Sequence, residues 1–305
     1  MPDKKISKGV KVEKSILDLA KKDRLKNLFK KHNIQIFHDQ NPNQKVDRFQ
    51  EILNSTKYST IKPPSSPWEL KYKYKNSSGT TKIMLVNKFS KKRPSLIFHH
   101  GIASTRPIIQ LRILADFDFN EKFNLFVIKA SHHDSHMQVF KKYVNNFNNL
   151  ASTIASCVIA TDEIINFHNS LSSKKIIVAG FSMGGIITSL HYFYRNTADY
   201  YFSIIAYPNL GDILFDKGNK DFIHNYESLS QNRSIKKSFK IPDELKDKPK
   251  DKVFPILSEY DELIRFKKAQ KFWKDYKVKS LDVGHFSVFV KRKEIREYIL
   301  SKFKG

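Results

Sequence analysis

The segment Ile176-Ile177-Val178-Ala179-Gly180-Phe181-Ser182-Met183-Gly184-Gly185 decides the fold. It joins a short apolar run, typical of a buried strand, to a segment with helical periodicity. The Gly-x-Ser-x-Gly between them predicts a sharp strand-to-helix turn, with a strained serine backbone and a raised hydroxyl. The neighbours two positions away must be small, and Gly180 and Gly184 meet that requirement. The Met183 amide would then point outward at a helix N-terminus, ready to stabilise an oxyanion.

Around this turn, short apolar strands alternate with longer helical stretches. This pattern predicts an α/β fold with a mostly parallel central sheet and helices on both faces. The expected strands are 95–99, 124–129, 175–179, 201–207, 253–258 and 277–282, and the expected helices are 105–115, 137–168, 184–194, 263–276 and 292–303. Two further β-like runs, 68–75 and 81–87, predict a hairpin before the first of these strands.

The chain divides into an N-terminal extension and one larger domain. Residues 1–67 are basic and partly helical in pattern, with amphipathic spacing at 15–31 and a second short helix expected near 46–53. Residues 68–305 hold the expected α/β domain. Within it, 208–252 is a polar insertion without clear core periodicity, and we expect it to form a lid.

A second motif precedes the serine turn. The apolar strand Leu96-Ile97-Phe98-His99 ends at His100-Gly101, followed by Ile102. Together the two motifs resemble the α/β-hydrolase superfamily, whose nucleophile elbow matches Gly180 to Gly184 and whose oxyanion loop matches His100-Gly101. The resemblance implies that the backbone amides of Ile102 and Met183 form the oxyanion hole. Because these donors belong to the backbone, their side-chain identities matter little.

The resemblance also implies where the remaining catalytic groups lie, because the family's chain order is nucleophile, acid, histidine. Asp261 follows the apolar run at 253–258 and matches the acid, with an ordinary helix N-cap as the alternative interpretation. Glu259 and Asp212 are the alternative acids. His285, in a Gly-His loop before the last helix, matches the base.

The expected function is therefore that of a serine hydrolase. It would act on an ester or related acyl substrate through Ser182, His285 and Asp261 and an acyl-enzyme intermediate. A serine at the elbow argues against dehalogenase and epoxide-hydrolase chemistry, which needs a carboxylate nucleophile. The alternatives are an acyltransferase, a catalytically inactive member of the fold, and a basic protein that binds membranes or nucleic acid.

The cluster His132-His133-Asp134-Ser135-His136 invites a metal hypothesis. His132 and His136 have His-x-x-x-His spacing, but that spacing aligns two ligands only on a helix, and this cluster follows a strand. We expect no metal and no cofactor. In the resembled fold this loop lines the pocket, so His133 is a candidate for substrate contact.

Composition limits the partners and the compartment. The 305 residues carry a net charge of +25, concentrated in 1–100 and 216–305. Most of the cations are lysines without interleaved aromatics, which does not favour nucleic acid. The single cysteine forms no intrachain disulfide, and the start resembles no secretory signal, so we expect a cytoplasmic protein. Its partners would be a small or lipid-like acyl substrate and an anionic membrane surface touched by 15–31. The oligomeric state stays open.

Overall fold

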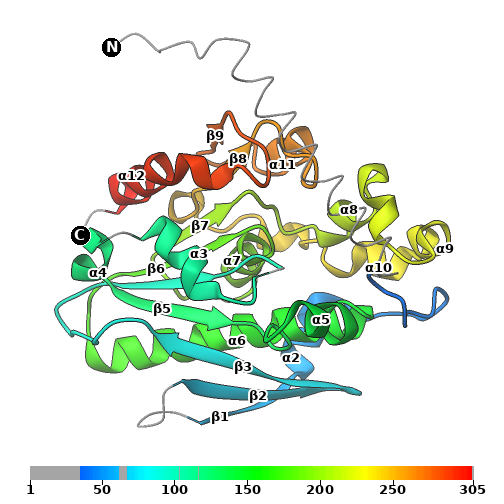
Figure 1. Cartoon of the computed structure of the whole chain (residues 1–305), viewed down its shortest axis with the longest axis horizontal. Helices are drawn as coiled ribbons and strands as arrows, with labels where there is room; N and C mark the ends of the chain where they lie inside the picture. Colours follow the sequence, from blue (N-terminus) through cyan, green and yellow to red (C-terminus); the bar gives the residue numbers. More distant parts are fainter. Residues whose placement is uncertain (1–34, 62–66, 103, 116, 304–305) are drawn as a thin grey trace.

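The computed structural model describes residues 35–61, 67–102, 104–115 and 117–303, so the expected helix at 15–31 lies outside it. One 9-stranded sheet runs through the molecule in the order β1-β2-β3-β5-β4-β6-β7-β8-β9 (Figure 1). β1 to β3 pair antiparallel and β4 to β9 run parallel, which confirms the predicted fold class. The strands are β1 (Lys57–Ile61), β2 (Trp68–Tyr74), β3 (Ser77–Leu85), β4 (Ser95–His99), β5 (Asn124–Lys129), β6 (Ile176–Phe181), β7 (Tyr200–Ile204), β8 (Ile256–Ser258) and β9 (Lys279–Leu281).

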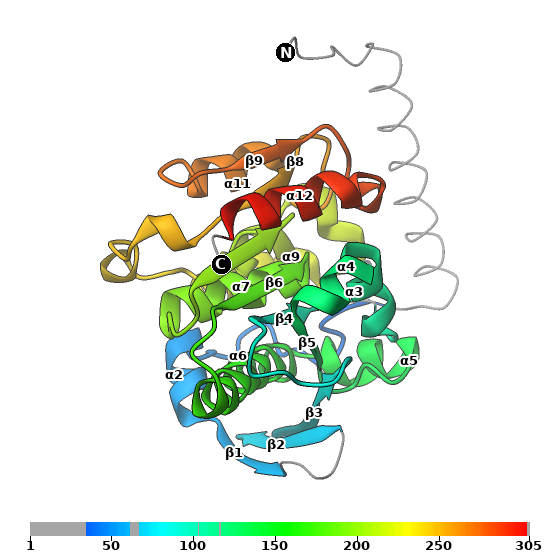
Figure 2. The same ribbon diagram turned by 90° about the vertical axis from the view of Figure 1, so that its left-hand side faces the viewer.

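Helices cover both faces of this sheet (Figure 2). One apolar core holds side chains of α2, α6, α7 and α11, and a second core on the opposite face holds those of α3, α4 and α12. The helices are α2 (Phe49–Ser55), α3 (Pro107–Leu114), α4 (Phe117–Lys122), α5 (His136–Gln138), α6 (Phe147–Leu171), α7 (Met183–Tyr194), α8 (Leu210–Leu214), α9 (Tyr226–Gln231), α10 (Arg233–Ser238), α11 (Phe266–Phe272) and α12 (Arg292–Lys302).

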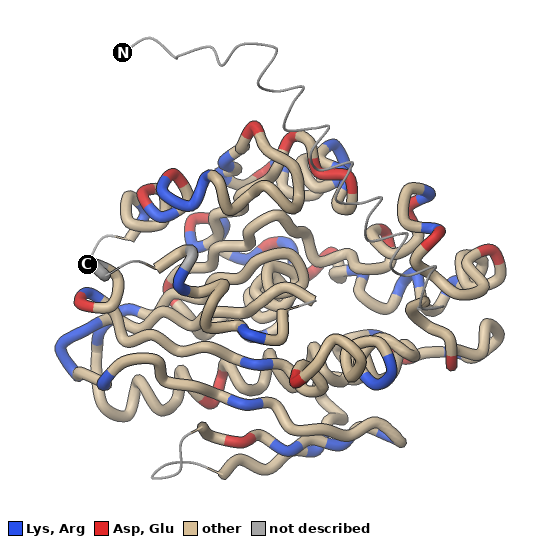
Figure 3. The backbone as a smooth tube through the Cα atoms, viewed as in Figure 1, with Lys and Arg blue, Asp and Glu red and all other residues tan. Residues whose placement is uncertain are grey.

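The central strands are buried on both faces. β4, β6 and β7 carry no charged residue, and most of the charged residues lie on the helices, the loops and the outer strands (Figure 3). Successive side chains of one strand enter opposite cores: Leu96 and Phe98 pack with α3 and α12, while Ile97 packs with α6 and α7. Parallel strands buried in this way read as continuous apolar runs, which is why the sequence identified them.

Several elements differ from the sequence-based expectation: α4 was not predicted, and β7 and β8 are shorter than the strands expected at 201–207 and 253–258. The strand β1 was not predicted, because an edge strand with exposed side chains such as Tyr58 and Ile61 has no apolar alternation. The helix expected at 137–168 is divided, and α6 begins only at Phe147. Its start has a physical cause, since the Asn146 side chain accepts a hydrogen bond from the Asn149 amide at 2.9 Å and caps the helix.

The insertion at 208–252 packs into the main core. It forms short helices, and Phe239 stacks on Phe49 of α2 with ring centroids 4.9 Å apart. Phe239 also meets Phe147 of α6 edge to face at 5.7 Å, and Ile235 and Ile241 are fully buried. The insertion and the described part of the N-terminal extension therefore stabilise each other. Its role as a lid stays a prediction.

Among the described helices, α6 is long and apolar enough by composition to cross a membrane. However, 78% of its most apolar stretch is buried inside the protein. Several of its buried polar side chains are paired within the fold, as Thr153 is with the Tyr72 hydroxyl at 2.7 Å. These contacts are those of a core helix beneath the sheet.

The start of α7 lies against the end of β4. A side chain at Gly184 would overlap the His99 carbonyl group, and one at Gly180 would overlap the backbone of Gly184. The elbow therefore tolerates no Cβ at either position. Gly101 differs, because a Cβ there would lie 3.6 Å from the nearest atom, the Phe181 oxygen, which is ordinary contact.

This difference gives a first prediction. Gly184→Ala should lower the free energy of unfolding by about 3 kcal/mol or more, because helix and strand must separate to admit the methyl group. Gly101→Ala, the matched control in the neighbouring loop, should lower it by less than about 1 kcal/mol. Urea denaturation of both variants measures the two values, and equal losses would contradict the packing described.

Candidate active site

Ser182 stands at the end of β6 in a strained conformation. Its φ of 54° and ψ of −116° lie outside the regions that side-chain-bearing residues favour. Its amide donates to the Ile204 carbonyl of β7 at 2.9 Å, which holds the turn in place. The side chain is half-buried, so the strain keeps the hydroxyl raised above the sheet edge.

His285 lies beside this hydroxyl. Its Nε2 is 3.0 Å from Ser182 Oγ, and its Nδ1 is 2.8 Å from Asp261 Oδ2. The turn after β9 presents the ring, with the Gly284 amide donating to Ser287 Oγ at 3.0 Å. Since a carboxylate only accepts, Nδ1 carries the proton and Nε2 can accept one from the serine.

Asp261 makes two kinds of contact with its two oxygens. Oδ2 faces the histidine, while Oδ1 accepts from the amides of Leu263 at 2.9 Å and Ile264 at 2.7 Å. The helix expected at 263–276 begins only at Phe266, with Arg265 as its N-cap, so Asp261 caps the preceding turn and is at the same time the histidine's partner. Glu259 and Asp212, the alternative acids, are both exposed.

The position of Asp261 follows from two hydrogen bonds between the loops after β8 and β9. The Glu259 amide donates to the Leu281 carbonyl at 2.9 Å, and the Tyr260 amide donates to the Val283 carbonyl at 3.1 Å. The two loops therefore leave the sheet side by side. This pairing brings Asp261 and His285, which are far apart in sequence, into direct contact.

The two proposed oxyanion donors lie around the same serine. Met183 is the first residue of α7. Ile102 follows Gly101, and a Cβ placed on Gly101 would lie 3.8 Å from the Ser182 Cβ. Among the residues that the structure describes, no acceptor is recorded for the amide of Met183 or of Ile102. Both are therefore free to bind a negatively charged oxygen, and the macrodipole of α7 adds to the field there.

His100 supports the loop rather than facing substrate. The Ala130 amide donates to its Nε2 at 3.1 Å, so the proton of the neutral ring is on Nδ1, which donates to the Gly101 carbonyl at 2.8 Å. Burial holds the pKa of His100 well below its usual range. The ring is thus a neutral donor with a defined tautomer.

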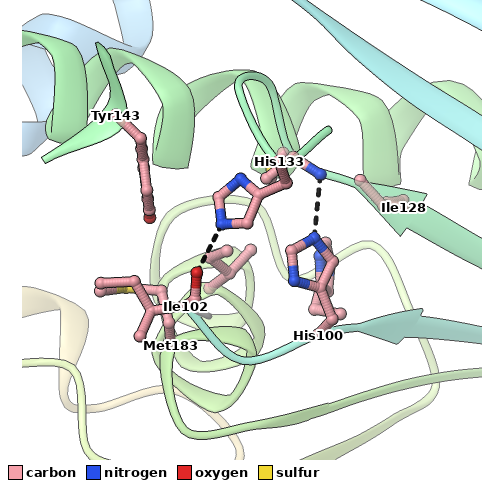
Figure 4. A pocket seen from close by; sticks show the side chains of 10 residues that line it. His100, Ile102, Ile128, His133, Tyr143 and Met183 are labelled. Carbon is pink, nitrogen blue, oxygen red and sulfur yellow. Dashed lines mark hydrogen bonds between the residues drawn. The ribbon is translucent and has the colours of Figure 1, made fainter. Parts of the chain in front are cut away.

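His133 is 1% exposed and faces two backbone carbonyls, of which Figure 4 shows that of Ile102. Its Nε2 is 2.8 Å from the Ile102 oxygen and its Nδ1 is 2.9 Å from the Ser131 oxygen. Burial lowers its pKa to about 4. A substrate contact for His133 stays a prediction, and in this arrangement neither ring nitrogen is open to a ligand.

Within the described ranges, no group of three or more His, Cys, Asp or Glu side chains is arranged to hold a metal ion. The residues His132 and Asp134 instead belong to a turn at the end of β5. His132 has a positive φ of 63°, and Asp134 pairs with Lys129 at 2.6 Å.

One contributor to the site escaped the sequence analysis. Gln110, on α3, accepts from the Gly101 amide through Oε1 at 3.0 Å. A glutamine inside an expected helix carries no signal for such a contact, since the contact depends on how α3 folds back over the oxyanion loop.

Comparison with known proteins identifies the fold. No family model matches the sequence, and no curated protein is similar to it in sequence. Among solved structures, it is similar to Est1E from Butyrivibrio proteoclasticus, with 13% identity and a TM-score of 0.53 over 77% of this chain and 98% of that one.

The structure of Est1E with ferulic acid bound gives 14% identity and a TM-score of 0.53, over 76% and 98% of the two chains. The esterase Pf2001 from Pyrococcus furiosus gives 14% identity and a TM-score of 0.48, over 85% and 94%. The likeness to Est1E, together with the mostly parallel 9-stranded sheet, shows that the chain has the α/β-hydrolase fold.

The buried histidines predict how stability depends on pH. Burial lowers the pKa of His99 to about 3, and its Nε2 is 2.9 Å from the hydroxyl of Thr161. In the unfolded chain its pKa is about 6.5, so below that pH the unfolded state binds more protons. Stability is full above pH 6.5 and falls as the pH falls toward 3, by about 1.4 kcal/mol per pH unit for this residue.

His99→Gln removes the titrating group and keeps a donor for Thr161. We expect this variant to lose less stability than the wild type between pH 6.5 and 4.5, as measured by urea denaturation. The same replacement at exposed His38 is the control. An unchanged slope in His99→Gln would contradict a neutral, buried His99.

Proposed function

We propose that this protein is a serine hydrolase that cleaves an ester or related acyl substrate through an acyl-enzyme intermediate. One observation carries the proposal: a continuous hydrogen-bonded chain from Ser182 Oγ to His285, at 3.0 Å, and on to Asp261, at 2.8 Å. A serine hydroxyl is a weak nucleophile on its own, and an adjacent base that accepts its proton makes it reactive.

In the first step, His285 Nε2 takes the hydroxyl proton as Ser182 Oγ attacks the carbonyl carbon of the substrate. The carbonyl π electrons move to the oxygen, which becomes an oxyanion. The tetrahedral intermediate collapses as the bond to the leaving alcohol breaks, and the imidazolium gives that alcohol its proton. Water then repeats the sequence on the acyl-enzyme and releases the acid.

The backbone amides of Met183 and Ile102 stabilise the oxyanion. Such donors bind the negative charge of the transition state more strongly than the neutral carbonyl, and losing one raises the barrier by about 2.7–4 kcal/mol. Asp261 keeps the proton of His285 on Nδ1 and stabilises the imidazolium. Each group thus acts on charge that develops during the reaction.

The proposal specifies the bond of the substrate that reacts and leaves the groups on either side of that bond open. The neighbour Est1E has been seen with ferulic acid, which is a statement about that protein. For this chain we propose an ester or related acyl compound, processed without a cofactor. Contact with an anionic membrane and a cytoplasmic location stay predictions, because the segment 15–31 lies outside the described residues.

Covalent labelling tests the proposed nucleophile. A fluorophosphonate should label the wild type at Ser182 with one adduct per chain. Ser182→Ala should abolish labelling, since no other described group has this activation, and His285→Ala should slow it at least about 10³-fold. Intact-mass spectrometry followed by peptide mapping measures both.

Turnover of p-nitrophenyl esters of increasing acyl length would then define the acyl preference. Labelling of Ser182→Ala at the wild-type rate, or a wild type that neither labels nor turns over any ester, would overturn the proposed function. Ester turnover without a covalent adduct would also contradict it.

The two oxygens of Asp261 make a second prediction possible. Asp261→Asn can still accept from the Leu263 and Ile264 amides but not from His285 Nδ1–H, so kcat should fall about 10³–10⁴-fold with little change in stability. Asp261→Ala should lose the same activity and, in addition, about 1 kcal/mol of the free energy of unfolding.

Glu259→Gln, in the same turn, is the matched control and should keep its activity within about threefold. Steady-state kinetics and urea denaturation measure the two effects separately. Loss of activity in Glu259→Gln with Asp261→Asn active would reassign the acid.

A further inference from the structure

The loop after β4 has an unusual degree of side-chain support. Three consecutive peptide units each have one polar atom that is hydrogen-bonded to a side chain. These atoms are the Gly101 amide nitrogen, the Gly101 carbonyl oxygen and the Ile102 carbonyl oxygen. The middle unit contains the Ile102 amide, the second proposed oxyanion donor. The orientation of that amide therefore depends on these contacts.

The first two units are held by Gln110 and His100. Gln110 Oε1 accepts from the Gly101 amide at 3.0 Å, and His100 Nδ1–H donates to the Gly101 carbonyl at 2.8 Å. In a trans peptide, the carbonyl oxygen and the following amide hydrogen point in opposite directions. Fixing the Gly101 oxygen on His100 therefore directs the Ile102 N–H away from that ring.

The third unit is held by His133, which belongs to the loop after β5. Its Nε2 lies 2.8 Å from the Ile102 carbonyl oxygen. Figure 4 shows the ring between His100 and Tyr143, with centroids 4.7 Å from each. Packing on both sides and full burial leave His133 little rotational freedom, so the Ile102 carbonyl has a rigid partner.

We propose that His133 is a positioning residue, whose Nε2–H donates to the Ile102 carbonyl and, together with His100, fixes both peptide units that flank the Ile102 Cα. The φ and ψ of Ile102 are then both restrained, and its amide stays aimed at the oxyanion without reorganising during the reaction. This inference rests on the proposed hydrolase function.

The cavity behind the ring supports positioning over substrate contact. His133, Tyr143, Ile102 and Met183 line a cavity of only about 10 Å³. That space holds at most a single water, so no acyl or alcohol group of a substrate fits beside the imidazole.

The neutral ring has one proton and two carbonyl neighbours, so only one of them receives a hydrogen bond. A proton on Nδ1 would serve the Ser131 oxygen, two residues away in the same turn. A proton on Nε2 instead connects the loops after β4 and β5. Only the second arrangement restrains the oxyanion loop, and the test must separate the two.

Asparagine and glutamine make that separation. Their amide nitrogens approximate the positions of Nδ1 and Nε2 respectively, and the side chains differ by one methylene group. His133→Gln should keep kcat within about 5-fold of the wild type, whereas His133→Asn should lower kcat about 10–100-fold with KM within about 3-fold, because a displaced donor affects the transition state.

Affinity for a transition-state analogue separates positioning from a purely structural role, because a purely structural role of His133 would leave this affinity unchanged. Binding of an alkyl boronic acid, which places a negative oxygen in the oxyanion site, should weaken in His133→Asn in parallel with kcat/KM. The unfolding midpoints of the two variants should agree. Equal kinetics for Asn and Gln, a change confined to KM, or a loss of activity that tracks loss of stability would each overturn the proposal.

A further measurement needs no activity. Side-chain ¹⁵N NMR of the wild type should show His133 protonated at Nε2 and His100 protonated at Nδ1. A proton on Nδ1 of His133 would refute the inference even in an active enzyme. If the wild type fails to react with a fluorophosphonate while these tautomers are found, the proposed function fails but the support of the loop stands.

Discussion

The contact between the first turn of α7 and the last residue of β4 is the constraint on which the site depends. Only a residue without a Cβ at Gly184 allows the helix to start beside the His99 carbonyl. Because α7 starts there, Ser182 and the Met183 amide lie next to the loop that follows β4. The parallel register of β4 and β6, in which His99 lies opposite Gly180, sets the same meeting point from the strand side. The hydroxyl and the Met183 amide are thus positioned by backbone packing, whereas the loop that carries the Ile102 amide is held in addition by side chains.

Burial without charge is the second feature of this region. His99, His100 and His133 are all buried, and burial lowers the pKa of each, so at neutral pH they act as uncharged donors and acceptors. Carrying three buried imidazolium ions close together would be very costly. The neutral imidazoles of His100 and His133 instead satisfy backbone groups of two loops, and that of His99 bonds the Thr161 hydroxyl.

What the sequence could predict follows from how local each signal is. The elbow was predictable because the spacing of Gly180, Ser182 and Gly184 reflects contacts within a few residues of one another, and the buried strands were predictable because both faces are apolar. The supporting side chain of Gln110 and the stacking of Phe239 on Phe49 were not, since the first depends on how α3 folds back over the loop and the second joins segments distant in the chain. Periodicity reports what an element buries, but it does not report against which partner.

Asp261 shows that two interpretations of one residue need not compete. A sequence offers a helix cap or a catalytic acid as alternatives because each role is usually assigned to a whole side chain. A carboxylate has two oxygens, and here Oδ1 accepts from two backbone amides while Oδ2 faces the imidazole. The amide bonds immobilise the carboxylate, so the geometry that caps the turn also holds the proposed acid beside His285. The structural role is therefore the means by which the chemical role is positioned.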